Sequence, residues 1–363
     1  MSFVRATPFH SRASAANRLN AWTNRNGWTL AAHYGEPAAE ALAARMTAAV
    51  ADISWRWRVA IEGPRAEEFL ARLLTRDPAK LEPGEAFKAL WLTDRGAVRG
   101  AGALARWGRE SFQLIATEPD LDWIARGAAL FDVQVSDTTE AEGGLAIIGP
   151  HARQIVEAME LDADLDPLRF RKHIWRGLAI TLSRFGEHGG YEIWCGADDA
   201  PLVWNRVAKA AEPFAFKFAG LGAMDVLDME AGVPRPGRDY ASARDDFATQ
   251  PMPSELGLLS LIDNDHAVFN GRAAVRTAKC TRERIGVELE GERPFPHTSL
   301  LRDGTRVGET MGSLYSPAMQ RAIALAIVES SSADPGTIFA LPDGTKACAC
   351  ALPFLPPPDP IAK

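Results

Sequence analysis

Two residues in glycine-containing segments of this chain have side chains suited to giving a proton to a leaving atom. His188 lies in the turn GEHGG, and Tyr240 ends the segment GRDY. An imidazole exchanges its proton near pH ~6.5 and a phenol near pH ~10, so His188 has the better intrinsic pKa. Glycine-rich segments of this kind are typical of loops, where binding and catalytic residues are often found. We therefore predict His188 and Tyr240 as the candidate catalytic residues.

Tryptophan and arginine alternate in the segment SWRWR, at residues 54–58. Successive strand residues face opposite sides of a sheet, so Trp55 and Trp57 would share one face and Arg56 and Arg58 the other. If the tryptophan face lines a binding site, the indoles form an aromatic wall. If the arginine face lines it, the guanidinium groups recognise a carboxylate. The remaining alternative is that both tryptophans pack between domains. We predict these four residues to bind substrate, and an aromatic acid suits either arrangement.

The composition is that of a globular protein of two or three domains. The chain has 363 residues, a formal net charge of −7, 47% hydrophobic residues and 24% charged residues. Single domains usually hold roughly 100–200 residues. An acidic chain is not built to neutralise phosphates, so we predict no nucleic-acid partner. No segment approaches the ~18 apolar residues of a membrane span, and the N-terminus lacks the apolar core of a signal peptide, so we expect a cytoplasmic protein without a membrane partner.

The four cysteines are too few and too irregularly spaced for a disulfide framework in a chain of this size. Cys348 and Cys350 have a C-x-C spacing, which is not a usual zinc pattern. We therefore predict buried thiols and no metal site.

The elements that must position these side chains follow a repeated order. Residues 36–51 have helical composition, and the strand pattern follows near residue 54. A helix is predicted from residue 64, with a proline in its first turn, and three apolar runs over residues 81–117 predict an antiparallel meander. A further helix and strand complete a block over residues 53–137. This block is predicted to be a ferredoxin-like α+β unit.

A second unit echoes the first, because GLAIIGP followed by HARQIVEAM repeats the pattern of VAIEGP followed by RAEEFLARLL. RGLAITLSRF and GGYEIWCG are predicted strands, and DAPLVWNRVAKAA is a predicted helix. After residue 251 the pattern changes to short strands, with turns at residues 303–304 and 343–344. This last part predicts a small barrel or jelly roll.

Five segments in this order resemble those of a known family. They are FLARLLTRDPAKLEPGEAFKALWLTDRGAV, LAIIGPHARQIV, GGYEIWCGADDAPLVWNRV, AGLGAMDVLDMEAGVPRPGRDY, and VFNGRAAV together with TMGSLYSPAMQRAIALAIV. The chain resembles the aminomethyltransferase family of the glycine cleavage system T protein and its folate-dependent demethylase relatives. The resemblance extends over nearly the whole chain.

The resemblance implies an α+β, three-domain, cloverleaf-like fold with tetrahydrofolate in a central channel. The folate-binding α+β domain would comprise residues 1–52 and 138–250, the ferredoxin-like domain residues 53–137, and the C-terminal β-barrel domain residues 251–363. Members of the family transfer one-carbon units to folate from an aminomethyl group on a carrier protein, or from methylated sulfur, nitrogen or oxygen compounds. The fold alone leaves the substrate open.

The resemblance also implies roles for residues of the folate site. In the family, the Glu of the Gly-Tyr-Glu segment holds the pterin, and here it is Glu192, because a carboxylate can accept two parallel hydrogen bonds from a pterin. Tyr191 would either contact folate or pack beneath the strand. Asp225 would either contact folate or pair within its helix. Relatives place an Arg before this Asp, whereas this chain has Met224, which makes the local site less able to recognise anions.

A second departure concerns the substrate amine. The family's aminomethyl-transferring members carry a pair of aspartates where this chain has Gly100 and Ala101. We therefore predict a tetrahydrofolate-dependent methyltransferase, or demethylase, that moves a methyl group from a small-molecule donor to tetrahydrofolate. The expected donor is a methoxylated aromatic acid and the product 5-methyltetrahydrofolate, with His188 or Tyr240 protonating the leaving oxygen. The alternatives are an aminomethyl or methylamine-donor transferase giving methylenetetrahydrofolate, and a non-catalytic folate-binding accessory protein.

Overall fold

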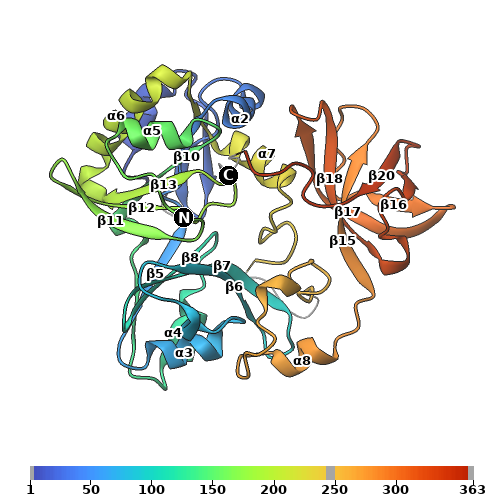
Figure 1. Ribbon diagram of the computed structural model, residues 1–363. Helices are drawn as coiled ribbons and strands as arrows, with labels where there is room; N and C mark the ends of the chain where they lie inside the picture. The colour runs from blue at the N-terminus through green and yellow to red at the C-terminus, as the bar shows by residue number, and fades with distance from the viewer. Residues whose placement is uncertain (1–3, 243–249, 359–363) are drawn as a thin grey trace.

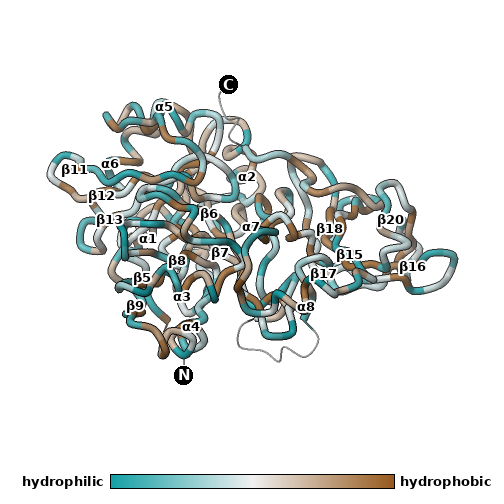
Figure 2. Tube along the Cα trace, turned by 60° about the horizontal axis from the view of Figure 1, so that its bottom comes forward, coloured by the Kyte–Doolittle hydropathy of each residue, from teal (hydrophilic) through white to brown (hydrophobic). Residues whose placement is uncertain are grey.

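The computed structural model describes residues 4–242 and 250–358. Three lobes surround the centre of the molecule (Figure 1). Two of them are α+β units that lie together, and the third is a β-barrel that stays to one side in both views (Figures 1 and 2). This arrangement confirms the predicted α+β fold class with three cloverleaf-like parts.

The first lobe is built on a six-stranded sheet in the order β11-β12-β13-β10-β4-β14. The strands of this sheet are β4(Ala49–Asp52), β10(Glu142–Ile148), β11(Phe170–Trp175), β12(Leu178–Ser183), β13(Tyr191–Gly196) and β14(Lys217–Ala219). A small sheet beside it contains β1(Arg5–Ala6), β2(Trp22–Arg25) and β3(Trp28–Ala31). The helices are α1(His10–Ala16), α2(Pro37–Met46), α5(Ala152–Ala158), α6(Ala200–Ala211) and α7(Leu221–Glu230). Helices α5 and α6 cover one face of the large sheet, and α2 and α7 cover its other face at β4 and β10.

The second lobe is a five-stranded antiparallel sheet in the order β6-β7-β8-β5-β9, with two helices on one face. Its elements are β5(Trp57–Glu62), α3(Ala66–Leu73), β6(Ala86–Leu92), β7(Val98–Gly108), β8(Ser111–Ala116), α4(Leu121–Ala128) and β9(Gln134–Asp137). The predicted meander corresponds to β6, β7 and β8. The face without helices packs against the first lobe, where Ile115 meets Phe170 and Phe185. The two sheets therefore face each other across the centre of the molecule.

The predicted echo between the two units has a structural cause at the strand-to-helix turn. Gly63 follows β5 with φ +138°, and Gly149 follows β10 with φ +117°. A Cβ at Gly63 would lie 2.5 Å from the carbonyl oxygen of Asp132, and one at Gly149 would lie 2.7 Å from that of Ala44. Both turns need glycine, because only glycine combines this φ with so close a backbone approach.

The third lobe is a closed barrel in the order β15-β18-β17-β16-β19-β20. Its strands are β15(Arg282–Leu289), β16(Ser299–Arg302), β17(Thr305–Ser316), β18(Arg321–Glu329), β19(Ile338–Ala340) and β20(Lys346–Cys350). The predicted turns at residues 303–304 and 343–344 join β16 to β17 and β19 to β20. Apolar side chains of β17 and β18 meet Met229 at the end of α7, which attaches the barrel to the first lobe.

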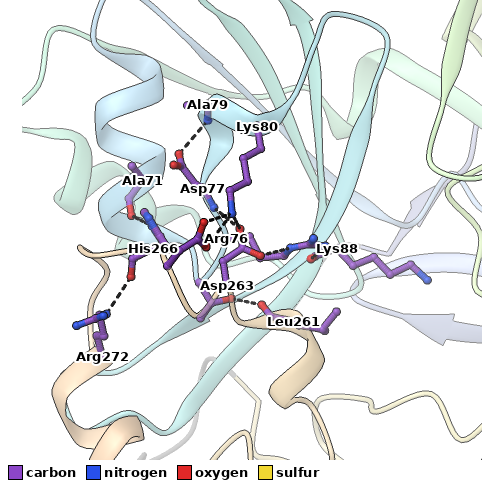
Figure 3. A network of polar contacts seen from close by, with 12 residues as sticks. Ala71, Arg76, Asp77, Ala79, Lys80, Lys88, Leu261, Asp263, His266 and Arg272 are labelled. Carbon is purple, nitrogen blue, oxygen red and sulfur yellow. Dashed lines mark hydrogen bonds and ion pairs between the residues drawn. The ribbon is translucent and has the colours of Figure 1, made fainter.

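The barrel begins at residue 282, later than the boundary predicted at residue 251. The segment between them contains α8(Arg272–Thr277) and docks on the second lobe. Its Asp263 binds Arg76 and Lys80, each at 3.1 Å, and His266 Nε2 lies 2.8 Å from the carbonyl oxygen of Ala71 (Figure 3). The sequence pattern groups this segment with the barrel because neither part has a long helix. In the structure, however, the segment contacts the second lobe. Short one-turn helices complete the chain: η1(Pro78–Lys80), η2(Thr139–Ala141), η3(Ala197–Asp199), η4(Glu212–Phe214), η5(Leu259–Leu261) and η6(Ser330–Ser332).

Candidate functional site

A cavity of about 270 Å³ lies between the two α+β lobes. Most of its wall is apolar, with side chains from the β4–β5 turn, from β7 and β8, and from the segment after α7. Its charged wall residues are Arg56, Lys88, Glu187, Asp228 and Arg235. Such a mostly apolar cleft with a few convergent polar groups at a domain interface is the usual form of a small-molecule site.

A second cavity of about 450 Å³ shares Trp55, Thr117 and Arg235 with the first. It lies toward the barrel and carries two further guanidinium groups in its wall, those of Arg25 and Arg238. The two cavities therefore adjoin at these residues. The wall of the second cavity holds three cations and two anions: Arg25, Arg235, Arg238, Glu118 and Asp225.

Of the two predicted tryptophans, Trp55 alone lines these cavities. Residues 54–56 form a turn, in which the amide of Arg56 donates to the carbonyl oxygen of Ile53 at 3.1 Å, and β5 begins at Trp57. The strand alternation expected for Trp55 and Trp57 is therefore wrong. The guanidinium of Arg25 packs over the ring of Trp55, with its central carbon 5.1 Å from the ring centroid.

Trp57 and Arg58 lie in structural positions away from the cavities. Trp57 belongs to the core of the second lobe, where its Nε1 donates to Asp137 at 2.9 Å. Arg58 is 1% exposed, stacks on Trp194 at 3.9 Å and lies 3.2 Å from a carboxylate oxygen of Glu142. The structure thus corrects the prediction that these two residues bind substrate, because both are committed to packing and to local polar contacts.

Arg56 does line the cavity, and its guanidinium reaches back to Glu192. Arg56 Nη1 donates to Glu192 Oε1 at 2.5 Å. The other carboxylate oxygen of Glu192 accepts from Trp194 Nε1 at 3.2 Å and from Ser183 Oγ at 3.4 Å. Glu192 is 1% exposed and does not appear in the cavity wall. Its predicted contact with the pterin therefore stays a prediction, and Arg56 is the member of this pair that lines the cavity.

Tyr191 points to the opposite face of β13 from Glu192. It is buried in the core of the first lobe, and its hydroxyl donates to the carbonyl oxygen of Ala163 at 2.7 Å. Of the two roles predicted for Tyr191, packing beneath the strand is the one that agrees with its contacts, and its predicted role in cofactor binding is wrong.

Asp228, which is not among the predicted site residues, lies in the cavity wall on α7. Its Oδ1 is 2.6 Å from His188 Nε2, and its Oδ2 contacts the guanidinium of Arg235. Arg235 also binds Asp225, which in turn binds Arg25 at 2.9 Å. These five side chains form a continuous network that extends from the wall of the first cavity to the wall of the second.

His188 is 2% exposed, and its burial lowers its pKa to about 3. Glu187 opposes this shift, while Arg56 and Arg235 reinforce it. A histidine with this pKa is neutral near pH 7, so its Nε2–H donates to Asp228 and its Nδ1 is a buried acceptor without a partner among the described residues. This argues against the predicted role of His188 as proton donor to a leaving group. Its contact with Asp228 makes it a positioning residue.

Tyr240 lies in the wall of the first cavity and is 5% exposed. Burial raises the pKa of its hydroxyl, and the charges of Glu118 and Asp239 raise it further. The phenol therefore stays protonated and can donate a hydrogen bond. The catalytic role of Tyr240 stays a prediction, and its side chain lies in the wall of the first cavity.

Met224 lines the first cavity, as its apolar side chain requires, and Asp225 lines the second. The cation that the family carries before this Asp is absent from position 224, but Arg235 brings a guanidinium to the same carboxylate. Burial lowers the pKa of Arg235 to about 10, so it remains charged near neutral pH. Asp225 is thus held by ion pairs, and its predicted contact with folate stays a prediction.

The absence of an acidic residue at position 100 has a packing cause. A Cβ built on Gly100 would lie 2.1 Å from the ring of Trp91. The indole Nε1 of Trp91 donates to Asp120 at 3.0 Å, and Arg99 binds the same carboxylate at 2.6 and 2.7 Å. Any side chain at position 100 would displace this group. Ala101, the next residue, lines the cavity without a polar group.

The sequence held one signal for the residues that were missed. Helix α7 is apolar apart from three acidic residues, and Asp225 and Asp228 are three positions apart, which places them on one face. Two carboxylates on one face of a mostly buried helix need cations or a ligand. Arg235, in the segment VPRPG, was within reach as their partner.

The described residues hold no group of three or more side chains suited to bind a metal ion. Within the same residues, no helix is long and apolar enough to cross a membrane.

Comparisons with known proteins agree with the fold and extend it. Residues 10–263 match the GCVT N-terminal domain, and residues 282–357 match the glycine cleavage T-protein C-terminal barrel domain. An aminomethyltransferase of Rubrobacter xylanophilus is 33% identical, with 83% of this chain and 82% of that protein covered. One of Staphylococcus carnosus is 28% identical, with 92% of each covered.

The crystal structure of the glycine cleavage system aminomethyltransferase T from Bartonella henselae superimposes with a TM-score of 0.86 at 22% identity. It covers 98% of this chain and 99% of that one, so the likeness of fold extends from end to end. The chain therefore belongs to the aminomethyltransferase family of the glycine cleavage T protein, whose members are tetrahydrofolate-dependent one-carbon transferases.

Proposed function

We propose that the protein transfers the carbon of an aminomethyl group to tetrahydrofolate, giving methylenetetrahydrofolate. In a balanced reaction, the donor R–S–CH2–NH3⁺ and tetrahydrofolate give R–SH, NH4⁺ and methylenetetrahydrofolate. The carbon stays at the oxidation level of formaldehyde, so no external oxidant is needed. This reaction is the predicted alternative to methyl transfer, and the relatives named aminomethyltransferase favour it.

The observation that carries the proposal is a carboxylate in the cavity wall. A donor ammonium group needs a negative partner when it leaves water. Asp228 is 6% exposed and lines the cavity, and a carboxylate offers about four acceptor positions, so its contacts with His188 and Arg235 leave room for one more donor. His188 fixes the orientation of this carboxylate. Asp228 would thus supply the acidic group that Gly100 and Ala101 lack.

The residues of the two cavities fit tetrahydrofolate. The apolar walls of the first cavity suit a flat heterocycle. Three arginines line the second cavity beside two carboxylates, Glu118 and Asp225, and this excess of one positive charge suits the anionic glutamate tail. Arg235 Nε is buried without a partner among the described residues, which leaves a donor for such a ligand. When bound, tetrahydrofolate supplies the nitrogens that accept the one-carbon unit.

The chain's own side chains would orient the reactants and manage protons. Tyr240, protonated in the cavity wall, donates a hydrogen bond and does not act as a base. The apolar walls exclude water, which would otherwise compete for the one-carbon unit. Trp55 lies in the wall of both cavities and can contact a ligand in either one.

The test is to identify the product. The purified protein would be given tetrahydrofolate with a ¹³C-labelled aminomethyl donor, or with ¹³C-labelled methoxybenzoates, and the folate product analysed by mass. Labelled methylenetetrahydrofolate from the aminomethyl donor is the expected result. Asp228→Asn should lower kcat/KM for this donor by about 100-fold, because it removes a charge-assisted contact of a buried ammonium. Glu110→Gln is the matched control, because it also replaces a carboxylate by an amide but lies at an exposed position. It should leave kcat/KM unchanged.

A second candidate function is supported by a specific observation. Ala101 presents no carboxylate, and three cations of the cavity wall, Arg56, Lys88 and Arg235, face only two anions there. An anionic aromatic methyl ether suits such a wall. Labelled 5-methyltetrahydrofolate from a methoxybenzoate, with no product from the aminomethyl donor, would replace the first proposal by this one. Folate binding without any product would favour the accessory role instead.

A further inference from the structure

Trp55 and Arg56 line the cavities although they belong to no helix or strand. Both lie in the turn of residues 54–56, between β4 and β5. The amide of Arg56 donates to the carbonyl oxygen of Ile53 at 3.1 Å. A turn has few backbone hydrogen bonds of its own, so neighbouring side chains must hold it if its residues are to meet a ligand in one geometry.

Asp52, the last residue of β4, provides such contacts. Its Oδ1 accepts from the amide of Ser54 at 2.9 Å and from the hydroxyl of Ser54 at 2.6 Å. Its Oδ2 accepts from Thr7 Oγ1 at 2.6 Å. A side-chain oxygen that accepts from the amide two residues later is typical of a turn that begins at an aspartate. None of these donors is charged, so the contacts depend on the positions of the carboxylate oxygens and not on an ion pair.

Ser54 connects the same turn to the neighbouring strand β10. The pairing of β4 with β10 places Asp52 opposite Leu145, and the amide of Ile53 then donates to the carbonyl oxygen of Gly144 at 2.9 Å. One residue later, the hydroxyl of Ser54 accepts from the amide of Gly144 at 3.1 Å. A side chain thus takes over from the backbone where the chain leaves the sheet. Asp52 and Ser54 fix this point, directly before the two cavity residues.

We propose that Asp52 is a positioning residue for the ligand site, because it holds, through Ser54, the turn that presents Trp55 and Arg56 to the cavities. The proposal rests on the two cavities being the site of the proposed function. Asp52 is absent from the walls of both cavities, so it acts on a ligand only through the turn.

Packing of the Trp55 ring is the competing explanation for its position. The ring belongs to a buried apolar cluster with three neighbours, Trp28, Leu30 and Leu221. If this packing alone fixed the ring, the contacts of Asp52 would be dispensable for its position. Variants that remove the hydrogen bonds and keep the cluster therefore separate the two explanations.

The first measurement needs no ligand. The protein is labelled with 5-fluorotryptophan, and the fluorine NMR signal of Trp55 is assigned by its absence in Trp55→Phe. Asp52→Ala should shift or broaden this signal, because Ser54 loses both of its contacts with the carboxylate. Asp52→Asn should leave it in place, since the amide oxygen accepts from Ser54 and the amide nitrogen can donate to the hydroxyl of Thr7. The signal of Trp91, in the core of the second lobe, should stay fixed in each variant.

Thr7→Val is the matched control, because it removes a hydrogen bond to the other oxygen of the same carboxylate and leaves the turn intact. It should lower stability without moving the Trp55 signal. Ser54→Ala covers the case in which Asp52→Ala does not fold. It keeps the amide and removes the hydroxyl that joins Asp52 to Gly144, so it should move the signal in the same way.

The second measurement is the affinity for tetrahydrofolate, by calorimetry under anaerobic conditions. A loosened turn presents the cavity residues in the binding geometry for only part of the time, which raises the Kd in proportion. With both contacts to Ser54 lost, the Kd of Asp52→Ala should rise by about tenfold. Asp52→Asn and Thr7→Val should bind as the wild-type protein does.

The outcomes separate this proposal from the proposed function. An unmoved Trp55 signal in Asp52→Ala and Ser54→Ala would overturn the proposal, because packing alone would then hold the ring. So would a signal that moves equally in Asp52→Asn, since the charge would then be responsible, or a moved signal with an unchanged Kd. If the wild-type protein does not bind tetrahydrofolate, the proposed function fails, and the fluorine signal decides whether Asp52 positions the turn.

Discussion

Acid should destabilise the first lobe through His188. Its pKa is about 3 in the folded protein, below its ordinary value of 6.5, chiefly because the ring is buried. The unfolded chain therefore binds more protons between these two values. The stabilisation is fully present above pH 6.5 and is lost as the pH falls toward 3.

The size of the effect follows from the shift. Each pH unit below the unfolded pKa costs about 1.4 kcal/mol for one proton, so lowering the pH from 8 to 5 should cost about 2 kcal/mol through this residue. Urea unfolding at pH 8 and pH 5, followed by circular dichroism, measures this cost as the difference between the wild-type protein and His188→Gln. The glutamine amide can still donate to Asp228 but takes up no proton, and the carboxyl groups common to both proteins cancel.

An NMR titration of the imidazole protons gives an independent check, with the His188 signal assigned by its absence in His188→Gln. The signal should not move between pH 8 and pH 5. Glu187→Gln is the matched control, because it removes the neighbouring charge that raises the pKa of His188 and leaves the ring buried. A titration midpoint near pH 6.5, or the same pH dependence of stability in both proteins, would refute the assignment of His188 as a buried neutral group.

Three substitutions test the packing assignments. Gly100→Ala should lower stability by about 1–3 kcal/mol, because its Cβ would lie 2.1 Å from the Trp91 ring; an unchanged thermal midpoint contradicts this. Trp57→Phe should lower the free energy of unfolding by about 1 kcal/mol, because the hydrogen bond to Asp137 is lost. The Kd for folate should stay unchanged, and a higher Kd would show that Trp57 belongs to the binding site. Arg58→Met should lower the free energy of unfolding in urea by about 2 kcal/mol, because two buried carbonyl groups lose their donor. The Kd for folate should stay unchanged. A changed Kd together with wild-type stability would contradict this assignment.

The elements of this fold were predictable because their signals are local. The apolar runs of the meander, the glycine that ends β5 and the one that ends β10 are each visible within a few residues. The resemblance to a family then supplied the arrangement of the three lobes. The start of the barrel was misplaced because residues 251–281 resemble loops in composition, and only their contacts with the second lobe assign them.

The site was less predictable because its contacts are long-range. Arg56 and Glu192 are separated by 136 residues, so neither reveals the other. The alternation predicted for Trp55 and Trp57 was wrong because residues 54–56 form a turn before β5. The alternating tryptophans and arginines gave no sign of this turn. The block at Gly100 was equally hidden, because it depends on the orientation of one indole from the neighbouring strand.

Helix α7 shows why the site and the fold cannot be separated in this protein. Its three carboxylates are held in two places. Asp225 and Asp228 share Arg235 at the cavities, and Glu230 accepts from Arg45 at 2.6 Å and from Ser316 Oγ of the barrel at 2.5 Å. A helix held rigidly at its end by the barrel keeps the first two carboxylates in fixed positions. The barrel therefore contributes to the site through α7, without needing a residue of its own beside the first cavity.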